Sequence, residues 1–118
     1  MNKQRVILAN GSRLLREMLN RIFRKSDHLE VVQEITDHHN LSAAIERLDA
    51  EWVIMSPEKD QTMPSWVDKY MLKHPEVRFL TVSNDGSQVK MKWLDKQEKT
   101  LSGLSLKDLL YILEQQTN

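Results

Sequence analysis

The sequence predicts a doubly wound α/β fold, in which helices cover both faces of a mostly parallel sheet. Short apolar runs alternate three times with longer segments whose apolar residues recur at helical spacing. Such an alternation is typical of βαβ units, which build a parallel sheet. The length agrees, because a chain of 118 residues forms one domain and buries roughly two thirds of the surface that its unfolded chain exposes.

The composition excludes several classes of function. The chain has 17 basic and 17 acidic residues, so its formal net charge is zero and provides no overall field to attract nucleic acid or an anionic membrane. It has no cysteine, which excludes disulfides, thiolate nucleophiles and thiolate metal ligands. No signal peptide or membrane-spanning run is visible, so we expect a cytoplasmic protein with no membrane partner.

The first strand and helix are predicted on either side of a polar break. Residues 4–9 end in a continuous apolar run, which is typical of a central strand covered on both faces. After Asn10 and Gly11, residues 12–25 have an apolar stripe at helical spacing opposite an arginine-rich face. The break is therefore the point where a strand turns directly into a helix.

The next elements continue this alternation. β-branched residues predict a strand at 29–35, and apolar residues at helical spacing predict a helix at 41–49. A short apolar run predicts a strand at 51–55. A helix at 64–74 follows, because proline suits a first helical turn. The next apolar run predicts a fourth strand at 77–83, which ends at a turn-rich segment.

The chain beyond the fourth strand breaks the alternation. Within a strand predicted at 88–94, residues 88–93 alternate strictly between polar and apolar, a period of two that a helix cannot use. A polar turn separates them from residues 98–102, so the simplest interpretation is a β-hairpin that runs antiparallel off the fourth strand. A capping-box variant at Ser105 then begins a leucine-rich helix over 105–115.

Several local strings resemble one known family, the receiver domains of bacterial response regulators, especially those of LuxR-type regulators. The strings are Leu14-Leu15-Arg16-Glu17, Glu51-Trp52-Val53-Ile54-Met55-Ser56, Met63-Pro64 and His74-Pro75-Glu76-Val77. The resemblance implies a CheY-like (flavodoxin-like) fold with strands in the parallel order 2-1-3-4. An antiparallel hairpin would replace the family's fourth helix and fifth strand.

The same resemblance places the family's phosphorylation residues on positions that lack acids. Receivers bind magnesium through two adjacent acidic residues after the first strand, and Asn10 and Gly11 occupy these positions. A neutral amide and a glycine are poor substitutes for the anionic oxygens that magnesium prefers. The phosphoacceptor aspartate aligns with Ser56, whose hydroxyl forms no acyl phosphate and is a weak nucleophile without a base.

The two remaining parts of a receiver site are a hydroxyl and a lysine. Thr81 retains the hydroxyl, whereas the lysine of the fifth strand has no assigned match and Lys92 and Lys99 are candidates. We therefore expect no catalytic residue, cofactor or metal ion. What is left is a vestigial pocket made of Asn10, Gly11, Ser56 and Thr81.

The residue types alone allow several other functions. His38 and His39 could join a metal site, or a hydrolase site with Ser56, although no nucleophile elbow is present. The vestigial pocket could bind a small ligand, with stray carboxylates supplied by Glu58, Asp60 and Asp85. The hairpin lysines could form a small nucleic-acid patch, but a solvated role that protects a sheet edge fits them better.

The main interaction hypothesis concerns the hairpin. Its apolar residues either fold inward under the last helix or form a surface for self-association. The candidates for that surface are Val89, Met91, Trp93 and Leu101. We expect a non-phosphorylatable, non-enzymatic interaction module in bacterial signal transduction or transcriptional regulation. Its partner would be another protein or a second copy in a homodimer, without direct contact to nucleic acid.

Overall fold

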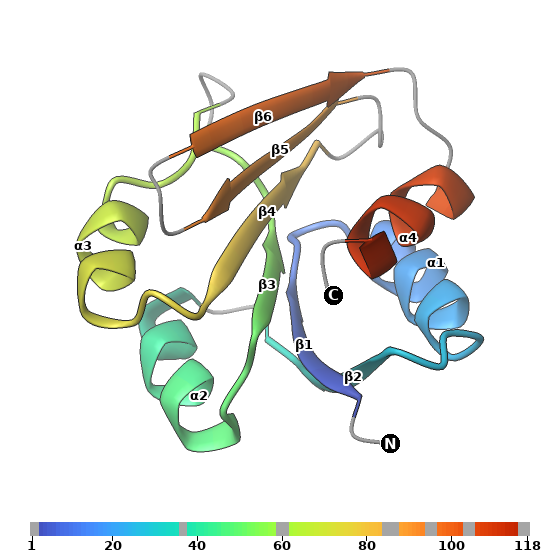
Figure 1. The fold of residues 1–118 in the computed structure, drawn as a ribbon, viewed down its shortest axis with the longest axis horizontal. Helices are drawn as coiled ribbons and strands as arrows, with labels where there is room; N and C mark the ends of the chain where they lie inside the picture. Colours follow the sequence, from blue (N-terminus) through green and yellow to red (C-terminus); the bar gives the residue numbers. More distant parts are fainter. Residues whose placement is uncertain are drawn as a thin grey trace.

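The computed structural model describes residues 3–35, 38–58, 62–83, 88–93, 97–102 and 106–115. Figure 1 shows one twisted sheet with helices on both of its faces. The strands are β1 (Gln4–Ala9), β2 (Leu29–Glu34), β3 (Trp52–Met55), β4 (Arg78–Val82), β5 (Gln88–Trp93) and β6 (Gln97–Ser102). The helices are α1 (Arg13–Phe23), α2 (Leu41–Leu48), α3 (Trp66–Lys73) and α4 (Leu106–Gln115), and a short 3-10 turn, η1 (His38–Asn40), precedes α2.

The order of strands across the sheet is β2-β1-β3-β4-β5-β6. β1 pairs in parallel with β2 and with β3, and β3 pairs in parallel with β4. β5 is antiparallel to both β4 and β6. The predicted parallel order 2-1-3-4 and the antiparallel hairpin at its end are therefore confirmed.

Two apolar layers attach the helices to the sheet. α1 and α4 cover one face, and α2 and α3 cover the other (Figure 1). The helices contribute Leu15, Leu19, Phe23, Leu109 and Leu113 to the first layer, and Leu41, Ala44, Ile45, Val67 and Met71 to the second. The central strands are buried on both faces, as their continuous apolar runs predicted.

The ends of the described helices follow from local interactions. Ser12 is the N-cap of α1, and its hydroxyl oxygen accepts a hydrogen bond from the backbone N–H of Leu15 at 3.2 Å. α3 begins two residues later than expected, because Pro64 is part of a turn in which its carbonyl accepts from Val67. In the part of the chain that the structure describes, no helix is long and apolar enough to cross a membrane.

Candidate functional site

Three of the predicted pocket residues follow or end the central strands on the same edge of the sheet. Asn10 comes directly after β1, Ser56 directly after β3, and Thr81 is the penultimate residue of β4. Because parallel strands end at the same edge, the backbone positions converge there. In open α/β sheets this edge is where ligands bind.

The Asn10 side chain joins two strands that are not neighbours. It is completely buried, and its Nδ2 donates a hydrogen bond to the Val82 carbonyl oxygen of β4 at 3.1 Å. Since β3 lies between β1 and β4, this bond crosses the end of β3. The amide oxygen Oδ1 of Asn10 is buried and has no hydrogen-bond partner among the described residues. The amide thus holds the edge of the sheet together and leaves one acceptor unsatisfied.

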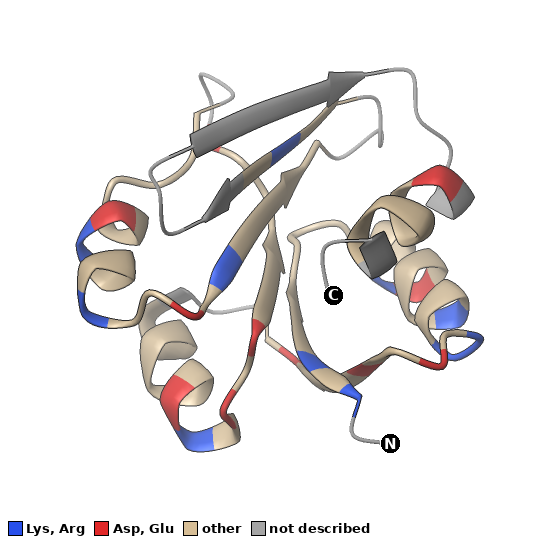
Figure 2. Ribbon diagram, viewed as in Figure 1, with Lys and Arg blue, Asp and Glu red and all other residues tan. Residues whose placement is uncertain are grey.

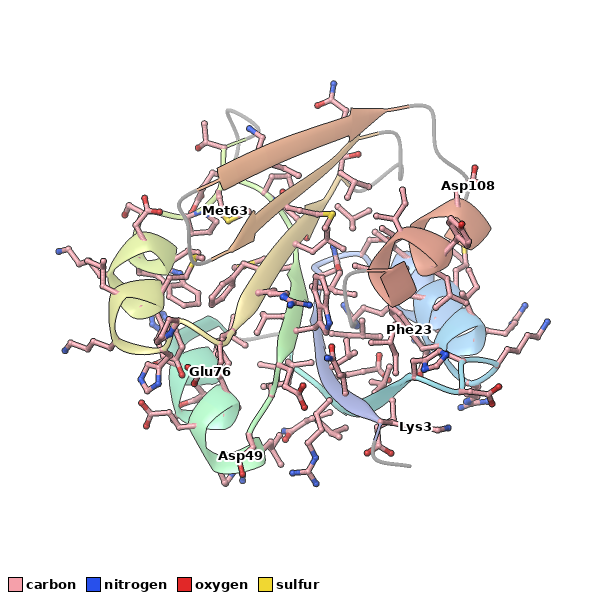
Figure 3. All side chains as sticks on the ribbon, viewed as in Figure 1. Lys3, Phe23, Asp49, Met63, Glu76 and Asp108 are labelled. Carbon is pink, nitrogen blue, oxygen red and sulfur yellow. The ribbon has the colours of Figure 1, made fainter. Side chains whose placement is uncertain are left out.

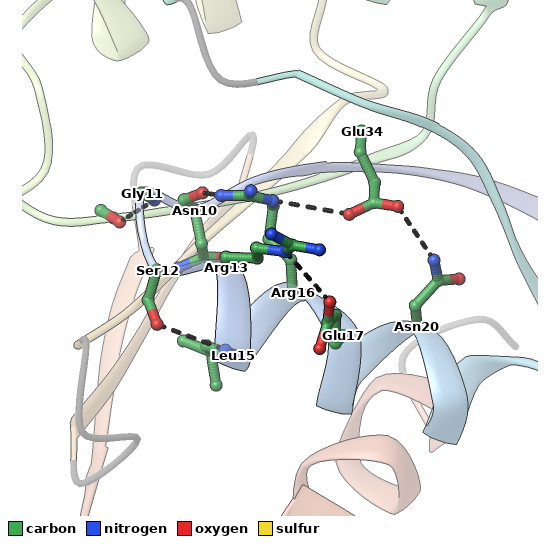
Figure 4. A network of polar contacts seen from close by, with 10 residues as sticks. Asn10, Gly11, Ser12, Arg13, Leu15, Arg16, Glu17, Asn20 and Glu34 are labelled. Carbon is green, nitrogen blue, oxygen red and sulfur yellow. Dashed lines mark hydrogen bonds and ion pairs between the residues drawn. The ribbon is translucent and has the colours of Figure 1, made fainter.

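A guanidinium group lies beside the same turn. Arg16 of α1 donates to the backbone carbonyl of Asn10, and its Nε lies 3.5 Å from Oε1 of Glu34 (Figure 4). The other carboxylate oxygen of Glu34 accepts from Nδ2 of Asn20 at 3.1 Å. Only 12% of the Arg16 side chain is exposed, so this is a partly desolvated ion pair that fixes α1 against β2.

Gly11 and Ser56 bond directly to each other. The backbone N–H of Gly11 donates to the Ser56 hydroxyl oxygen at 2.8 Å. A Cβ atom placed on Gly11 would lie 3.7 Å from that oxygen, which is ordinary van der Waals contact, and the backbone of Gly11 is not left-handed. The local backbone therefore does not require glycine. Gly11 affects the site because it contributes no side chain to it.

The register of the hairpin supplies a lysine that the sequence did not assign. Lys90 of β5 lies directly opposite Thr81 of β4, and Thr81 is almost completely buried. Directly opposite residues of antiparallel strands point to the same face, so the Lys90 side chain lies on the Thr81 side of the sheet. The expected candidates have other neighbours: Lys92 is opposite Phe79, and Lys99 is opposite Met91.

The pocket residues do not fit a magnesium ion. Asn10 uses its amide nitrogen to bond Val82, Gly11 offers no side chain, and the Ser56 oxygen already accepts a hydrogen bond. Magnesium requires several oxygen ligands, usually with one or two carboxylates among them. Within the described ranges, no group of three histidine, cysteine, aspartate or glutamate side chains is placed to bind a metal ion.

Two residues of the expected interaction surface are in the core instead. Val89 is 3% exposed and Met91 is 1% exposed, and both pack in the layer beneath α4 with Leu109 and Leu113. A hairpin needs a packed face to be stable, and this face provides it. Of the two alternatives for the hairpin, Val89 and Met91 therefore follow the inward one and form no part of an outer surface.

The other candidate residues are only partly described. The side chains of Trp93, Leu101 and His38, and residues Asp60 and Asp85, lie outside the described part of the structure. His39 is exposed at the start of α2, and Glu58 is exposed after β3.

Comparison with solved structures identifies the fold. The response regulator domain of Thermotoga maritima CheB superimposes with a TM-score of 0.56 at 21% identity, over 70% of this chain and 61% of that domain. The C-terminal domain of the coenzyme A biosynthesis bifunctional protein CoaBC gives a TM-score of 0.47 at 12% identity, over 99% of this chain and 95% of that one. No known family profile and no curated protein sequence matches this chain. The first similarity and the parallel strand order β2-β1-β3-β4 give the chain a CheY-like receiver fold, to which the antiparallel strands β5 and β6 are joined at one edge.

Proposed function

We propose that this protein is a pseudo-receiver, with a CheY-like scaffold that does not transfer phosphoryl groups. It acts as a non-enzymatic protein-interaction module in bacterial signal transduction or transcriptional regulation, in the cytoplasm. The string Leu14-Leu15-Arg16-Glu17 resembles the first helix of receivers in LuxR-type regulators, which supports this proposal. The scaffold supports a signalling role by analogy with the family, and the site itself argues against phosphorylation.

The Gly11–Ser56 hydrogen bond is the observation that carries this proposal. A receiver needs a metal-binding carboxylate and a phosphoacceptor carboxylate at these two positions. Here a backbone N–H and a hydroxyl oxygen bond each other at 2.8 Å. Neutral groups that satisfy each other leave no anionic site for magnesium and no nucleophile for an acyl phosphate.

An apolar patch on α1 and α4 is the surface that we propose for self-association. Leu14 and Met18 of α1 are 68% and 42% exposed, and Tyr111 of α4 is 64% exposed. Leu110 and Ile112 are half-buried beside them. Exposed apolar side chains that gather on one surface mark interaction sites, and a homodimer would bury them.

The patch residues of α1 lie on the side of that helix that is toward α4. On α1, Arg16 and Asn20 bond Glu34 of β2, so their flank of the helix faces β2. Leu14 and Met18 lie on the opposite flank by helical periodicity. α4 packs beside α1 on the same face of the sheet (Figure 1), so that flank lies toward α4.

A second candidate function is a small-ligand sensor that uses the vestigial pocket. The buried, unpartnered amide oxygen of Asn10 favours it, because a polar ligand could donate a hydrogen bond to this oxygen at the edge of the sheet where Thr81 also lies. A thermal-shift screen against nucleotides and small metabolites tests this function. A stabilising ligand whose effect is lost in Thr81→Val and Lys90→Met would support the sensor.

Titration with beryllofluoride and magnesium, followed by NMR of the backbone amides, tests the proposed function. We expect no change at the amides of Gly11, Ser56 and Thr81. A saturable, magnesium-dependent shift of these signals would contradict it.

A further inference from the structure

Two cavities lie on the α2/α3 face of the sheet, opposite the α1/α4 patch, and we call them together the α2/α3 groove. It consists of two cavities of about 430 and 420 Å³ that share one wall residue, Tyr70. The first cavity lies at the start of α2 and the second at its end. The two cavities have opposite charge.

The cavity at the start of α2 is basic. Its walls are His39, Ser42, Trp66, Lys69, Tyr70 and Lys73. Lys69 and Lys73 are one turn apart on α3, both are exposed, and neither forms an ion pair within the described part of the chain. The first turn of α2 contains no acidic residue that would offset them.

The cavity at the end of α2 is acidic. Its charged wall residues are Glu46, Asp49, Glu51 and Glu76, together with His74. Figure 3 shows Asp49 and Glu76 on the α2 side of the sheet. His74 Nε2 lies 3.1 Å from Glu46 Oε1 and His74 Nδ1 lies 4.0 Å from Glu76 Oε1, so one imidazole faces two carboxylates.

Other charged residues near α2 and α3 do not line the two cavities, so they do not reduce the difference in charge between them. Arg47 of α2 bonds Gln33 of β2 at 3.1 Å and lines a different groove. Asp68 of α3 lines neither cavity. Arg5 donates to the Leu48 carbonyl near the acidic end, but it is not a wall residue. Figure 2 marks basic positions on α3 and acidic positions toward the end of α2.

Tyr70 forms an aromatic floor between the two halves. Its ring stacks on His74 at 4.4 Å and makes edge contacts with Trp66 at 6.2 Å and Phe79 at 6.0 Å. Its hydroxyl oxygen is buried and has no partner among the described residues, so the phenol neutralises neither Glu46 nor Glu76 by a hydrogen bond. The Tyr70 ring therefore lies between wall residues of unlike charge.

We propose that the α2/α3 groove binds an extended peptide segment that has an acidic side chain at one end and a basic side chain at the other. The acidic side chain pairs with Lys69 and Lys73, and the basic one pairs with Glu46 and Glu76. This interface is additional to the α1/α4 patch and does not depend on the state of the vestigial pocket.

The dimensions of the groove set the spacing of the two charges. Ser42 lines the basic cavity, and Asp49, the C-cap of α2, lines the acidic cavity seven residues later. The two cavities therefore extend together over about 10 Å of helix at 1.5 Å per residue. An extended chain covers about 3.3 Å per residue. The matching segment therefore has its two charged residues three positions apart, with small or apolar residues over Tyr70.

The test is a titration of the ¹⁵N-labelled full chain with capped tetrapeptides, followed by NMR. The probes are acetyl-Glu-Ala-Ala-Arg-amide and acetyl-Arg-Ala-Ala-Glu-amide, and the controls replace either charged residue with alanine. We expect at least one order of charges to bind with a Kd at least tenfold lower than either singly charged peptide. The shifted amides should map to α2 and α3.

Charge variants test each half separately. In the Lys69→Gln/Lys73→Gln variant, replacing the glutamate of the peptide with alanine should no longer raise the Kd. Replacing the arginine of the peptide with alanine should still raise it. Glu46→Gln with Glu76→Gln should do the reverse. The matched control is Arg21→Gln with Lys25→Gln, which should leave all affinities unchanged. Arg21 is in the last turn of α1 and Lys25 lies two residues beyond its end, so the pair has the same sequence spacing as Lys69 and Lys73.

The proposal is overturned if neither bipolar peptide binds better than the singly charged ones, or if the shifts map away from the groove. It is also overturned if the two groove variants and the control lower all affinities equally. None of these results bears on phosphoryl transfer, so a failure here is distinct from a failure of the pseudo-receiver proposal.

Discussion

The Nδ2 atom of Asn10 donates to the Val82 carbonyl oxygen at 3.1 Å, and this bond connects β1 to β4 across the end of β3. At the corresponding position a receiver has a carboxylate, which has no proton to donate at neutral pH. The asparagine here is thus a structural residue of the sheet edge. Restoring the acid would remove a bond on which this edge depends.

Asn10→Asp should lower the free energy of unfolding by about 1–3 kcal/mol at pH 7, because it places a buried carboxylate against a carbonyl oxygen. Burial raises the pKa of that carboxyl group, so the loss should shrink as the pH falls toward 4. Urea unfolding at both pH values measures this, with Asn10→Ala as the control for the lost bond alone. Equal stability of Asn10→Asp and the parent at pH 7 would show that the bond contributes nothing.

Met91→Ala should lower the free energy of unfolding by about 2–5 kcal/mol, because it leaves a cavity between the hairpin and α4. Met18→Ala is the matched control, since Met18 is 42% exposed and Met91 is 1% exposed. Its cost should be well below that of Met91→Ala. Urea unfolding of both variants gives the comparison, and similar costs would refute the inward packing of the hairpin.

Burial, followed by the carboxylates of Glu46 and Glu76, raises the pKa of Tyr70 to about 12 from an ordinary value of 10.0. The unfolded chain releases this proton at lower pH than the folded chain does. Tyr70 therefore makes the folded state lose stability as the pH rises from about 10 to about 12. In urea unfolding, the stability of Tyr70→Phe relative to the parent should increase between pH 9 and pH 11, and a constant difference would contradict this environment.

Self-association through the α1/α4 patch predicts a mass that rises with concentration in light scattering. Leu14→Ser with Tyr111→Ser should keep the protein monomeric at concentrations where the parent is dimeric. Leu72→Ser is the matched control, because Leu72 is 70% exposed on α3, on the other face of the sheet. A monomeric parent at all concentrations, or an equal effect of the control, would exclude this dimer.

The fold was predictable because its signals are local. Buried strands appear as continuous apolar runs, and Ser12 before the apolar stripe of α1 is a cap that the structure retains. The period of two indicated the strands of the hairpin, and the short polar turn between them indicated that they are antiparallel. The inward-facing side of the hairpin was not predictable, because burial of Met91 depends on where α4 packs.

The sequence predicted where the pocket residues lie on the sheet, but it did not predict which side chains contact one another there. Alignment with a family placed Asn10, Gly11, Ser56 and Thr81 at one edge of the sheet. Which lysine lies opposite Thr81 depends on the register of β5 against β4, and this register places Lys90 there. The alternation of the hairpin places Lys90 and Lys92 on the same face, and the register with β4 decides that Lys90 is the one opposite Thr81.

The central claim is that the Gly11–Ser56 pair has replaced the phosphorylation chemistry of the receiver scaffold. Intact-mass spectrometry after incubation with acetyl phosphate and magnesium tests it most directly. The account predicts that the mass of the protein stays unchanged. Saturable addition of one phosphoryl group, dependent on magnesium and abolished by Ser56→Ala, would contradict it.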